Sequence, residues 1–379
     1  MHLAFVSPFD PNDVRVFSGI PHFMVRALRE RVDRLSVVGP LPVGGAVRGR
    51  VDKLRHRLRG QPYLRAHTWA GVRPMAEAAR RPLAELQPDA ILSPSTLPLA
   101  ALDADCPTAS WADATFEANL LFYPGFTDLS EAHIVEAHDV ERAAIRRASA
   151  AVFASAYAAR SAAGYYGAAA ESVHVVPFGA NLDPEDIPSA DAVGEAIAAR
   201  SMGTCRLLFV GGDWSRKGGD IALRVAEELA DRGRPTTLTV IGTTPPVTGH
   251  PNLRVEGFLR KSVPDERARL RQLFVESHFL CMPVRAEDFG IVFAEAAAFG
   301  VPSVSSRVGG VPSAVADGES GVLFDVREQP GAIADRLEAL LSDIEGYRAL
   351  AASARSHYEL ELNWGVAVER VLALLQPLT

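Results

Sequence analysis

Residues 279–300 read Phe-Leu-Cys-Met-Pro-Val-Arg-Ala-Glu-Asp-Phe-Gly-Ile-Val-Phe-Ala-Glu-Ala-Ala-Ala-Phe-Gly. The apolar run 279–282 ends in a short loop, and an apolar, alanine-rich segment follows Gly290. A continuous apolar run of this length is typical of a parallel strand that is covered on both faces. The stretch therefore predicts a buried strand, a loop and a helix that starts near Gly290.

The same strand–helix pattern repeats in both directions from this stretch. The expected strands are 2–6, 35–38, 90–92, 108–111, 151–154, 173–176, 206–210, 238–241, 253–255, 279–282, 301–305 and 322–324. The expected helices are 20–31, 73–86, 131–148, 156–166, 218–232, 265–276, 290–299, 311–317, 330–342, 344–359 and a last one after Trp364. This alternation predicts an α/β protein with doubly wound parallel sheets, whose ligands bind off the carboxyl ends of the strands.

The chain is long enough for two domains, since it has 379 residues. The alternation breaks at 177–203, which is interpreted as a linker plus one helix, and it resumes at Cys205. We therefore expect an N-terminal domain over 1–195 and a C-terminal domain over 196–363. The cleft between two such domains is the expected place for a ligand.

Composition narrows the class of protein. The net charge of −7 argues against general nucleic-acid binding. The three cysteines are far apart, so neither a disulfide framework nor a metal site is expected. The N-terminal apolar run ends at Ser7 without a basic leader, and no apolar stretch approaches the ~20 residues that span a bilayer. A cytoplasmic protein is expected.

Glu287 and Glu295 are the first candidate functional residues. Glu287 falls in the loop, and Glu295 about one turn into the helix. The free N–H groups of that helix and its positive dipole end favour a diphosphate, and Gly290 allows the backbone to approach it. Carboxylates accept hydrogen bonds from sugar hydroxyls. The alternative is a solvated loop acid and a helix-dipole partner.

A second candidate segment is 206–220, Arg-Leu-Leu-Phe-Val-Gly-Gly-Asp-Trp-Ser-Arg-Lys-Gly-Gly-Asp. An expected strand ends at Gly211-Gly212, and Arg216 and Lys217 come just before a helix. Two cations at this place suit a pyrophosphate. The segment matches neither a Walker A loop nor a dinucleotide fingerprint. A solvated basic turn is the alternative.

In the first domain, the loop after strand 2–6 is longer than a usual strand–helix connection. Long loops at sheet ends are often functional. We expect Ser18 and Gly19, at its end, to face the phosphate site of the other domain. A plain surface loop is the alternative.

Together these segments resemble the GT-B-fold retaining glycosyltransferases, family four in the usual classification. The likeness is clearest from Arg206 to Phe324, and covers the Arg-Lys-Gly element, the Gly257 turn, the Glu-x7-Glu pair and the turn at 309–310. The resemblance implies two Rossmann-like domains that face a central cleft. It also implies that the last helix, 364–379, packs back onto the first domain.

The resemblance assigns roles by position in this sequence. Arg216 and Lys217 would bind the donor diphosphate, Glu287 the transferred sugar and Glu295 the ribose hydroxyls. Backbone at Phe289, Gly290 and Ile291 would support sugar and phosphate, and the loop at Gly257 and Phe258 would hold the base. Gly212 closes the first strand of this domain where many members soon carry an Arg. Here Asp213 follows it, so one phosphate contact is either lost or supplied by Arg216.

The first domain departs from the family pattern as well. Many members carry a His near the end of the fourth strand, where this chain reads Ser110-Trp-Ala-Asp113. Asp113 is therefore a candidate catalytic residue that contacts sugar or acceptor, or else a buried cap of the next turn.

The function expected from these features is that of a retaining hexosyltransferase. The departing phosphate would take the acceptor's proton, so the protein mainly positions the reactants and stabilises charge. No cofactor and no metal are expected, because Arg216, Lys217 and the helix dipole can neutralise a diphosphate. The Asp-Ala-Asp at 103–105 follows no convincing strand, so it is not expected to bind metal.

The expected partners are a nucleotide sugar and a glycan, lipid-linked or small-molecule acceptor. The basic stretch Arg48–Arg65 would allow peripheral contact with the inner membrane face, although a solvated segment explains it as well. The alternative functions are a non-catalytic nucleotide-sugar-binding protein and a nucleotide-sugar epimerase. Donor identity, acceptor identity and oligomeric state stay open at this point.

Overall fold

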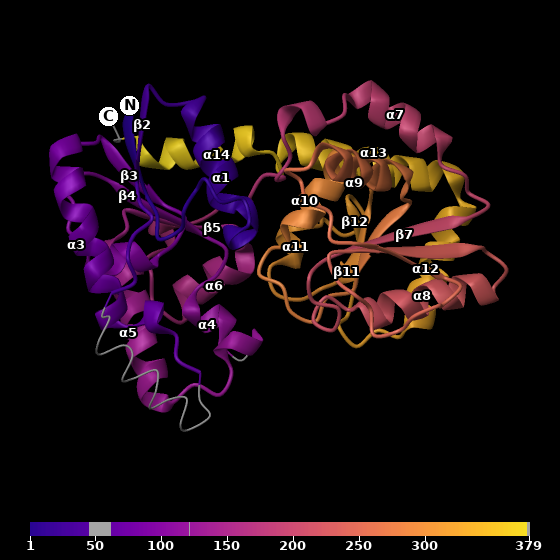
Figure 1. Cartoon of the computed structure of the whole chain (residues 1–379), viewed down its shortest axis with the longest axis horizontal. Coiled ribbons are helices and arrows are strands. Elements are labelled where there is room, and N and C mark those ends of the chain that lie inside the picture. Colours follow the sequence, from indigo (N-terminus) through magenta and orange to yellow (C-terminus); the bar gives the residue numbers. More distant parts are fainter. Residues whose placement is uncertain (45–61, 121, 377–379) are drawn as a thin grey trace. The chain divides into compact units, whose positions relative to one another are not determined.

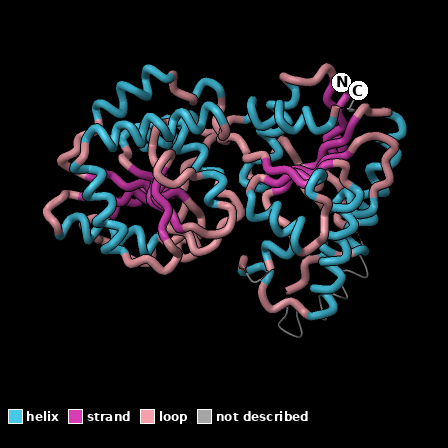
Figure 2. The backbone as a smooth tube through the Cα atoms, turned by 180° about the vertical axis from the view of Figure 1, so that it is seen from behind, coloured by secondary structure: helices cyan, strands magenta, loops and turns pink. Residues whose placement is uncertain are grey.

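The structure is a computed structural model that describes residues 1–44, 62–120 and 122–376. The chain divides into two compact units, each with its own sheet and helices (Figures 1 and 2). The first unit comprises Met1–Phe178 and the C-terminal segment from Trp364, and the second comprises Gly179–Asn363. Both sheets are six-stranded and parallel, which places the chain in the α/β class.

The sheet of the first unit has the strand order β2-β1-β3-β4-β5-β6. Its strands are β1 (His2–Val6), β2 (Arg34–Val38), β3 (Ala90–Ser93), β4 (Thr108–Ala112), β5 (Ala150–Phe153) and β6 (Val173–Val175). The central strands β3, β4 and β5 are buried along their whole length, as their continuous apolar sequences predict, whereas the edge strands β2 and β6 are partly exposed. The order reverses between β1 and β3, which is where ligands bind in such sheets.

The helices of the first unit begin where capping side chains are available. Thr68, Ser130 and Ser155 each accept a hydrogen bond from the backbone N–H three residues on, and so start three of these helices. The helices are α1 (Ile20–Arg29), α3 (Trp69–Leu86), α4 (Phe116–Asn119), α5 (Glu131–Arg147), α6 (Ala156–Gly164) and α14 (Trp364–Leu375). Short 3-10 turns are η1 (Val16–Gly19), η2 (Arg65–His67), η3 (Leu97–Ala101), η4 (Pro124–Phe126) and η5 (Ala170–Ser172).

The sheet of the second unit has the order β12-β11-β10-β7-β8-β9. Its strands are β7 (Cys205–Val210), β8 (Thr236–Ile241), β9 (Leu253–Gly257), β10 (Phe279–Met282), β11 (Ser303–Ser306) and β12 (Gly321–Phe324). Read from β9, this is the strand order of a dinucleotide-binding Rossmann sheet. The order in which successive strands are added reverses between β7 and β10, so the switch point of the sheet lies there.

Helices of the second unit alternate with its strands. They are η6 (Pro184–Asp186), α7 (Ala190–Ala199), α8 (Gly219–Asp231), α9 (Pro264–Glu276), α10 (Ile291–Ala298), α11 (Val311–Ala314), α12 (Pro330–Ser342) and α13 (Ile344–Leu360). Helix α10 is the helix that the opening stretch of sequence predicts, and nearly all of its residues are buried. Its surroundings therefore fix its position tightly.

The boundary between the units differs from the expected one at 195. Residues 179–195 belong to the second unit, because the backbone N–H of Ala180 donates to the carbonyl of Leu362 at 2.8 Å and Arg267 pairs with Asp183 at 3.2 Å. The helix after Trp364 lies in the first unit, where the Trp364 ring contacts the rings of Trp111 and Phe178. The linker packs against the second unit, so the boundary lies at Gly179. The sequence pattern gives no information on this packing.

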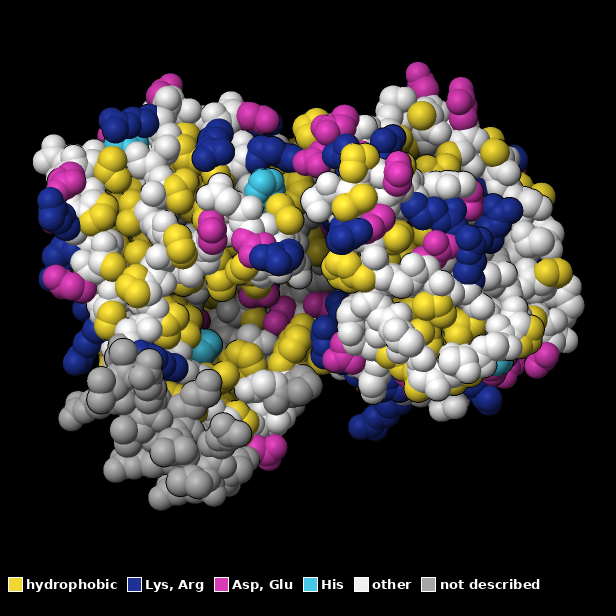
Figure 3. Space-filling view, in the orientation of Figure 1, with side chains coloured by type: hydrophobic (Ala, Val, Ile, Leu, Met, Phe, Trp, Pro, Cys, Tyr) yellow, Lys and Arg dark blue, Asp and Glu magenta, His cyan; other side chains and the backbone are white. Residues whose placement is uncertain are grey.

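Two further observations concern membranes. Within residues 1–44, 62–120 and 122–376, no helix is both long and apolar enough to cross a bilayer. Figure 3 shows acidic and basic side chains interspersed over the described part of one face. Most of the basic stretch Arg48–Arg65 lies outside the described residues, so its contact with a membrane stays a prediction.

Candidate active site

The two loops that carry the strongest sequence candidates meet between β7 and β10, where the strand order of the second sheet reverses. Strands β7 and β10 are neighbours, with Leu207 beside Phe279, so the loops 211–218 and 283–290 leave the same edge side by side. The backbone N–H of Arg285 donates to the carbonyl of Arg216 at 2.8 Å. The sheet topology therefore brings together residues that lie about seventy positions apart in the sequence.

The loop after β7 is a compact turn that presents Arg216 and Lys217. The carboxylate of Asp213 accepts a hydrogen bond from the backbone N–H of Arg216 at 3.0 Å and so closes the turn. Gly218 ends it with φ at +75°, and a Cβ there would lie 2.0 Å from the carbonyl oxygen of Pro283. Only glycine allows this approach, which holds the turn against the neighbouring loop.

Arg216, Lys217 and Glu287 form a partly buried charge cluster. The ammonium of Lys217 is paired with the Glu287 carboxylate, and Nη1 of Arg216 lies 3.4 Å from the same oxygen, Oε2. Nη1 of Arg216 also donates to the carbonyl of Ala286 at 2.8 Å. Nε of Arg216 also lies 3.7 Å from the Asp213 carboxylate, so two cations face two carboxylates. The two neighbouring cations suit an anion such as a diphosphate.

Helix α10 begins beside this cluster. Gly290 is its N-cap, with φ at +82°, and a Cβ there would lie 2.5 Å from the ring of Phe293 and 3.2 Å from Cγ of Glu287. The backbone N–H of Gly310 donates to the carbonyl of Glu287 at 3.0 Å, so the turn after β11 supports the loop from its other side. The first-turn N–H groups of α10 lack partners within the helix and carry partial positive charge.

A second ion pair links the loop 283–290 to the start of α8. The Arg285 guanidinium binds both carboxylate oxygens of Asp220, on α8, at 2.8 and 2.7 Å. Its hydrogen bond and charge lower the pKa of Asp220 from its usual value. The pair fixes the start of α8 relative to the loop after β10.

Glu295 does not share the cluster around Glu287. Its side chain is 5% exposed, and its Oε1 accepts a hydrogen bond from Nζ of Lys261 at 2.5 Å. The same ammonium donates to the carbonyl of Asn181, in the linker, at 2.9 Å. Each candidate carboxylate is thus neutralised by its own lysine.

Lys261 was not predicted from the sequence. It follows Gly257-Phe258 by a few residues, and Arg260-Lys261 would have drawn attention as a cation pair beside the expected base-binding loop. Its link to Glu295 depends on how the loop after β9 folds against α10, which spacing does not indicate.

The expected base-binding residues lie at the end of strand β9. Gly257 has φ at +76°, and its carbonyl accepts from the N–H of Gly242 at 2.8 Å. Phe258 is 73% exposed, so its ring is available for stacking. Gly212 lies in the turn after β7, Phe289 is buried, and Ile291 is the first residue of α10.

The candidates of the first unit lie at the carboxyl edge of its own sheet. Ser18 and Gly19 end the loop after β1 with φ at +54° and +82°, directly before α1. Asp113 follows β4, and Thr115 rather than Asp113 caps the next helix, α4. The expected role of these residues toward a ligand stays a prediction.

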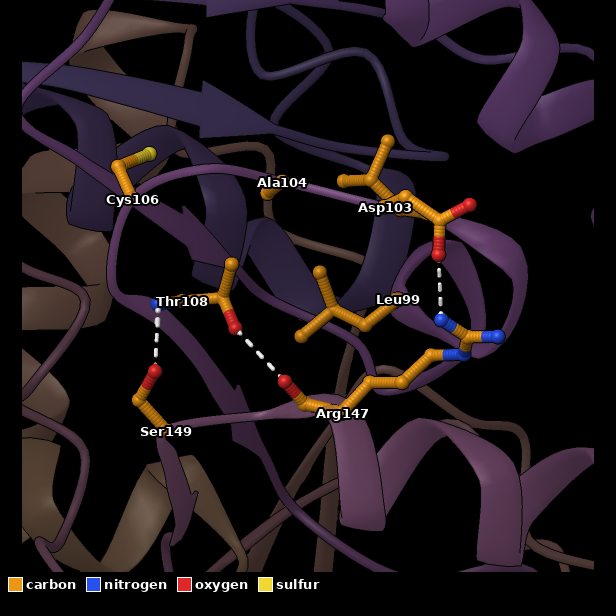
Figure 4. A pocket seen from close by; sticks show the side chains of 8 residues that line it. Leu99, Asp103, Ala104, Cys106, Thr108, Arg147 and Ser149 are labelled. Atoms are coloured by element: carbon orange, nitrogen blue, oxygen red, sulfur yellow. Dashed lines mark hydrogen bonds and ion pairs between the residues drawn. The ribbon is translucent and has the colours of Figure 1, made fainter.

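A pocket of about 210 Å³ lies at the opposite, amino-terminal edge of the first sheet (Figure 4). Asp103 is paired there with Arg147 at 2.6 Å, and Thr108 is bonded to Ser149 and to the carbonyl of Arg147. These polar groups satisfy one another, so they leave little for a ligand. In the described part of the chain, no group of His, Cys, Asp and Glu side chains is arranged to hold a metal.

Residues 204–343 match the family model of glycosyl transferases group 1. This match contains the loops after β7 and β10, and with them the whole charge cluster. This segment of the second unit therefore resembles the group 1 glycosyltransferases.

The curated relatives match this chain over part of their length. A D-inositol 3-phosphate glycosyltransferase of Xylanimonas cellulosilytica is 34% identical over 50% of this chain and 48% of its own. One from Catenulispora acidiphila is 32% identical over 62% of this chain and 58% of its own. The chain thus spans about half the length of the curated relatives that it matches.

Solved structures match nearly the whole chain. Sucrose-phosphate synthase from Thermosynechococcus elongatus has a TM-score of 0.68 at 16% identity and covers 99% of this chain, matched over 98% of its own. The Anabaena protein HepE in complex with UDP has a TM-score of 0.63 at 17% identity, over 99% of both chains. At such identities the likeness concerns the fold alone, which is GT-B.

Proposed function

We propose that the protein is a metal-independent, retaining glycosyltransferase that moves a hexose from a nucleotide sugar to a hydroxyl acceptor. One observation carries the proposal. Arg216, Lys217 and Glu287 meet beside the N-terminus of α10, at the point where the strand order of the second sheet reverses. An anionic leaving group and a sugar hydroxyl are the ligands that such a group of side chains would bind.

The proposed roles follow the geometry of the second unit. Arg216, Lys217 and backbone at Gly212, Gly290 and Ile291 bind the diphosphate, and Glu287 with backbone at Phe289 binds the sugar. Glu295 accepts from the ribose hydroxyls through Oε2, since Lys261 binds Oε1. Gly257 and Phe258 receive the base, which stacks on the exposed ring.

The proposed chemistry needs few protein groups. The acceptor attacks on the face from which the diphosphate departs, and the phosphate oxygen takes the acceptor's proton. Arg216, Lys217 and the α10 amides stabilise the charge that develops on the leaving phosphate. The rest of the rate enhancement comes from positioning of the two reactants.

Donor and acceptor are proposed from the relatives. HepE structures hold UDP and UDP-glucose, which makes a uridine donor the first to test. The curated relatives are named for D-inositol 3-phosphate, which is therefore the first acceptor to test. The first unit, through Ser18, Gly19 and Asp113, is proposed to complete the donor site and to contact the acceptor. A cytoplasmic location is part of the proposal.

The first experiment is a thermal-shift screen of the pure protein in EDTA against UDP-, GDP-, ADP- and dTDP-sugars. A ligand at about 100 times its dissociation constant adds roughly 2.7 kcal/mol of stability. We expect one nucleotide family to raise the melting temperature. Arg216→Ala and Lys217→Ala should remove that shift, while Arg224→Ala, on the exposed face of α8, should keep it.

Turnover separates an enzyme from a binding protein. Incubation of the donor that shifts the melting temperature with D-inositol 3-phosphate in EDTA should release the nucleoside diphosphate, and the product's anomeric proton should show the donor's configuration by NMR. Binding without turnover over a panel of acceptors would contradict the transferase proposal. Inverted product would contradict the retaining mechanism alone.

A further inference from the structure

The C-terminal end of α10 is held by two arginines. Nη1 of Arg200 donates to the carbonyl of Gly300 at 2.7 Å, and its Nη2 donates to the carbonyl of Phe299 at 3.1 Å. Nη1 of Arg355, on α13, donates to the carbonyl of Ala298 at 2.5 Å. Three successive carbonyls that the helix itself leaves without partners are thus satisfied by guanidinium groups.

Arg200 is an unusual arginine. It is only 6% exposed, and its hydrogen bonds go to backbone carbonyls and one hydroxyl. Its remaining partners are the hydroxyl of Tyr347 at 3.1 Å and the carbonyl of Val275 at 3.3 Å. A buried charge must be compensated, and here backbone carbonyls and the negative end of the α10 dipole provide the compensation.

The opposite end of the same helix carries the candidate donor site. Helix α10 has eight residues, so its two ends are about 12 Å apart. A helix this short moves as one rigid piece, and Glu295 lies halfway along it. A fixed C-terminus therefore fixes both the first-turn N–H groups and the Glu295 carboxylate.

We propose that Arg200, supported by Arg355, is a positioning residue for nucleotide-sugar binding, which acts by clamping the C-terminus of α10. The inference rests on the proposed function, because it gives Arg200 a role toward the nucleotide. Arg200 touches neither nucleotide nor sugar. It holds the amides and the carboxylate that do.

The test compares the wild type with Arg200→Lys, Arg355→Lys and Arg224→Lys. Lysine keeps the charge but lacks the planar fork that reaches two carbonyls at once. Arg224 is an exposed residue of α8 and serves as the matched control. If Arg200→Lys fails to fold, Arg355→Lys still tests the clamp, because Arg355 holds the carbonyl of Ala298 at the same end of α10.

Two readouts are needed. Hydrogen–deuterium exchange of the ligand-free proteins should be faster in the peptide over 288–300 for Arg200→Lys and Arg355→Lys, and unchanged over β8. Titration with UDP, or with the nucleotide that binds the wild type, should show an affinity lower by about tenfold or more in Arg200→Lys, because small displacements weaken several contacts together. Arg224→Lys should match the wild type in both.

The outcomes are distinct. Unchanged exchange over 288–300 would overturn the clamp. Faster exchange with unchanged nucleotide affinity would leave Arg200 a purely structural role and overturn the positioning proposal. A wild type that binds no nucleotide would contradict the proposed function, and with it the role of Arg200 toward the nucleotide.

Discussion

At the scale of single residues, the candidate site is built from carboxylates that each face a lysine. Lys217 is paired with Glu287 and Lys261 with Glu295. Burial makes an unpaired carboxylate costly, because it loses hydration without gaining a partner. Under the proposed function, the two pairs hold the acids in place for sugar hydroxyls in a site that also receives an anion.

Lys261 tests this interpretation of the second pair. Lys261→Met should lower the free energy of unfolding by about 1–2 kcal/mol, less than for a fully buried pair because the lysine is partly exposed. Chemical denaturation of Lys261→Met, Glu295→Gln and the double variant measures the coupling. Additive losses would show that the two side chains do not depend on each other.

Glu141, on α5 of the first unit, is a buried carboxyl outside the candidate site. Burial raises its pKa from the usual 4.5 to about 8, although a hydrogen bond from the Thr96 hydroxyl at 3.0 Å opposes that rise. A carboxyl with a raised pKa stays protonated in the folded chain while the unfolded chain ionises. The stabilisation that this protonated carboxyl contributes is therefore fully present below pH 4.5 and is lost as the pH rises toward 8.

Glu141→Gln should remove this pH dependence while its amide oxygen still accepts from Thr96. We expect the variant to gain on the order of 3 kcal/mol relative to the wild type between pH 4.5 and pH 8. Urea denaturation of both proteins at pH 5 and pH 8.5 gives the difference. Equal pH slopes in the two proteins would mean that Glu141 titrates normally.

At the scale of elements, glycines in left-handed conformations start α8 and α10. Gly218 lies against Pro283, and Gly290 against Phe293 and Glu287. These contacts place two helix N-termini beside two neighbouring strand ends. A side chain at either glycine would have to move the loop that carries the charge cluster.

Gly290→Ala and Gly194→Ala form a matched pair of element-level tests. At Gly290, with φ at +82° and a ring 2.5 Å from the new Cβ, alanine should destabilise the protein by about 1–3 kcal/mol and weaken nucleotide binding. Gly194 lies exposed within α7, with nothing within 4 Å, so alanine should stabilise it by roughly 0.5–1 kcal/mol. Thermal unfolding measures both, and equal effects would contradict the conformational argument.

At the scale of the whole molecule, the last helix completes the first unit although it follows the second in sequence. The Trp364 ring stacks near that of Phe178 at 5.8 Å and lies edge-on to Trp111 at 5.6 Å. The indole of Trp111 donates to the carbonyl of Val176 at 2.9 Å. The core of the first unit is therefore closed by a helix that follows the second unit in the sequence.

Trp364→Ala should lower the unfolding transition of the first unit and leave that of the second in place. Removal of a buried aromatic side chain costs about 3–5 kcal/mol. Calorimetry resolves the two units if they unfold separately. Leu360→Ala, at an exposed position just before the helix, is the control and should change neither transition. A shift of both transitions in Trp364→Ala would show that the units unfold as one.

Much of the fold was predictable from local pattern. Continuous apolar runs such as 279–282 identified the buried strands, and the strand at 90–92 lies at Ala90–Ser93. The pattern works because burial on both faces forces apolar residues at every position. The pattern was less exact at the ends of elements. A strand was expected over 301–305, but β11 starts at Ser303, and a helix was expected over 311–317, but α11 ends at Ala314.

The sequence by itself determined the chemical types at the candidate site, because Arg216, Lys217, Glu287 and Gly290 lie in loops that follow recognisable strands. Only the tertiary structure decided which of them meet. Strand order joins the loops after β7 and β10, whereas Lys261 reaches Glu295, and Arg200 reaches the end of α10, through packing. Spacing along the chain reports local conformation, but contacts between distant segments depend on the path that the whole chain takes.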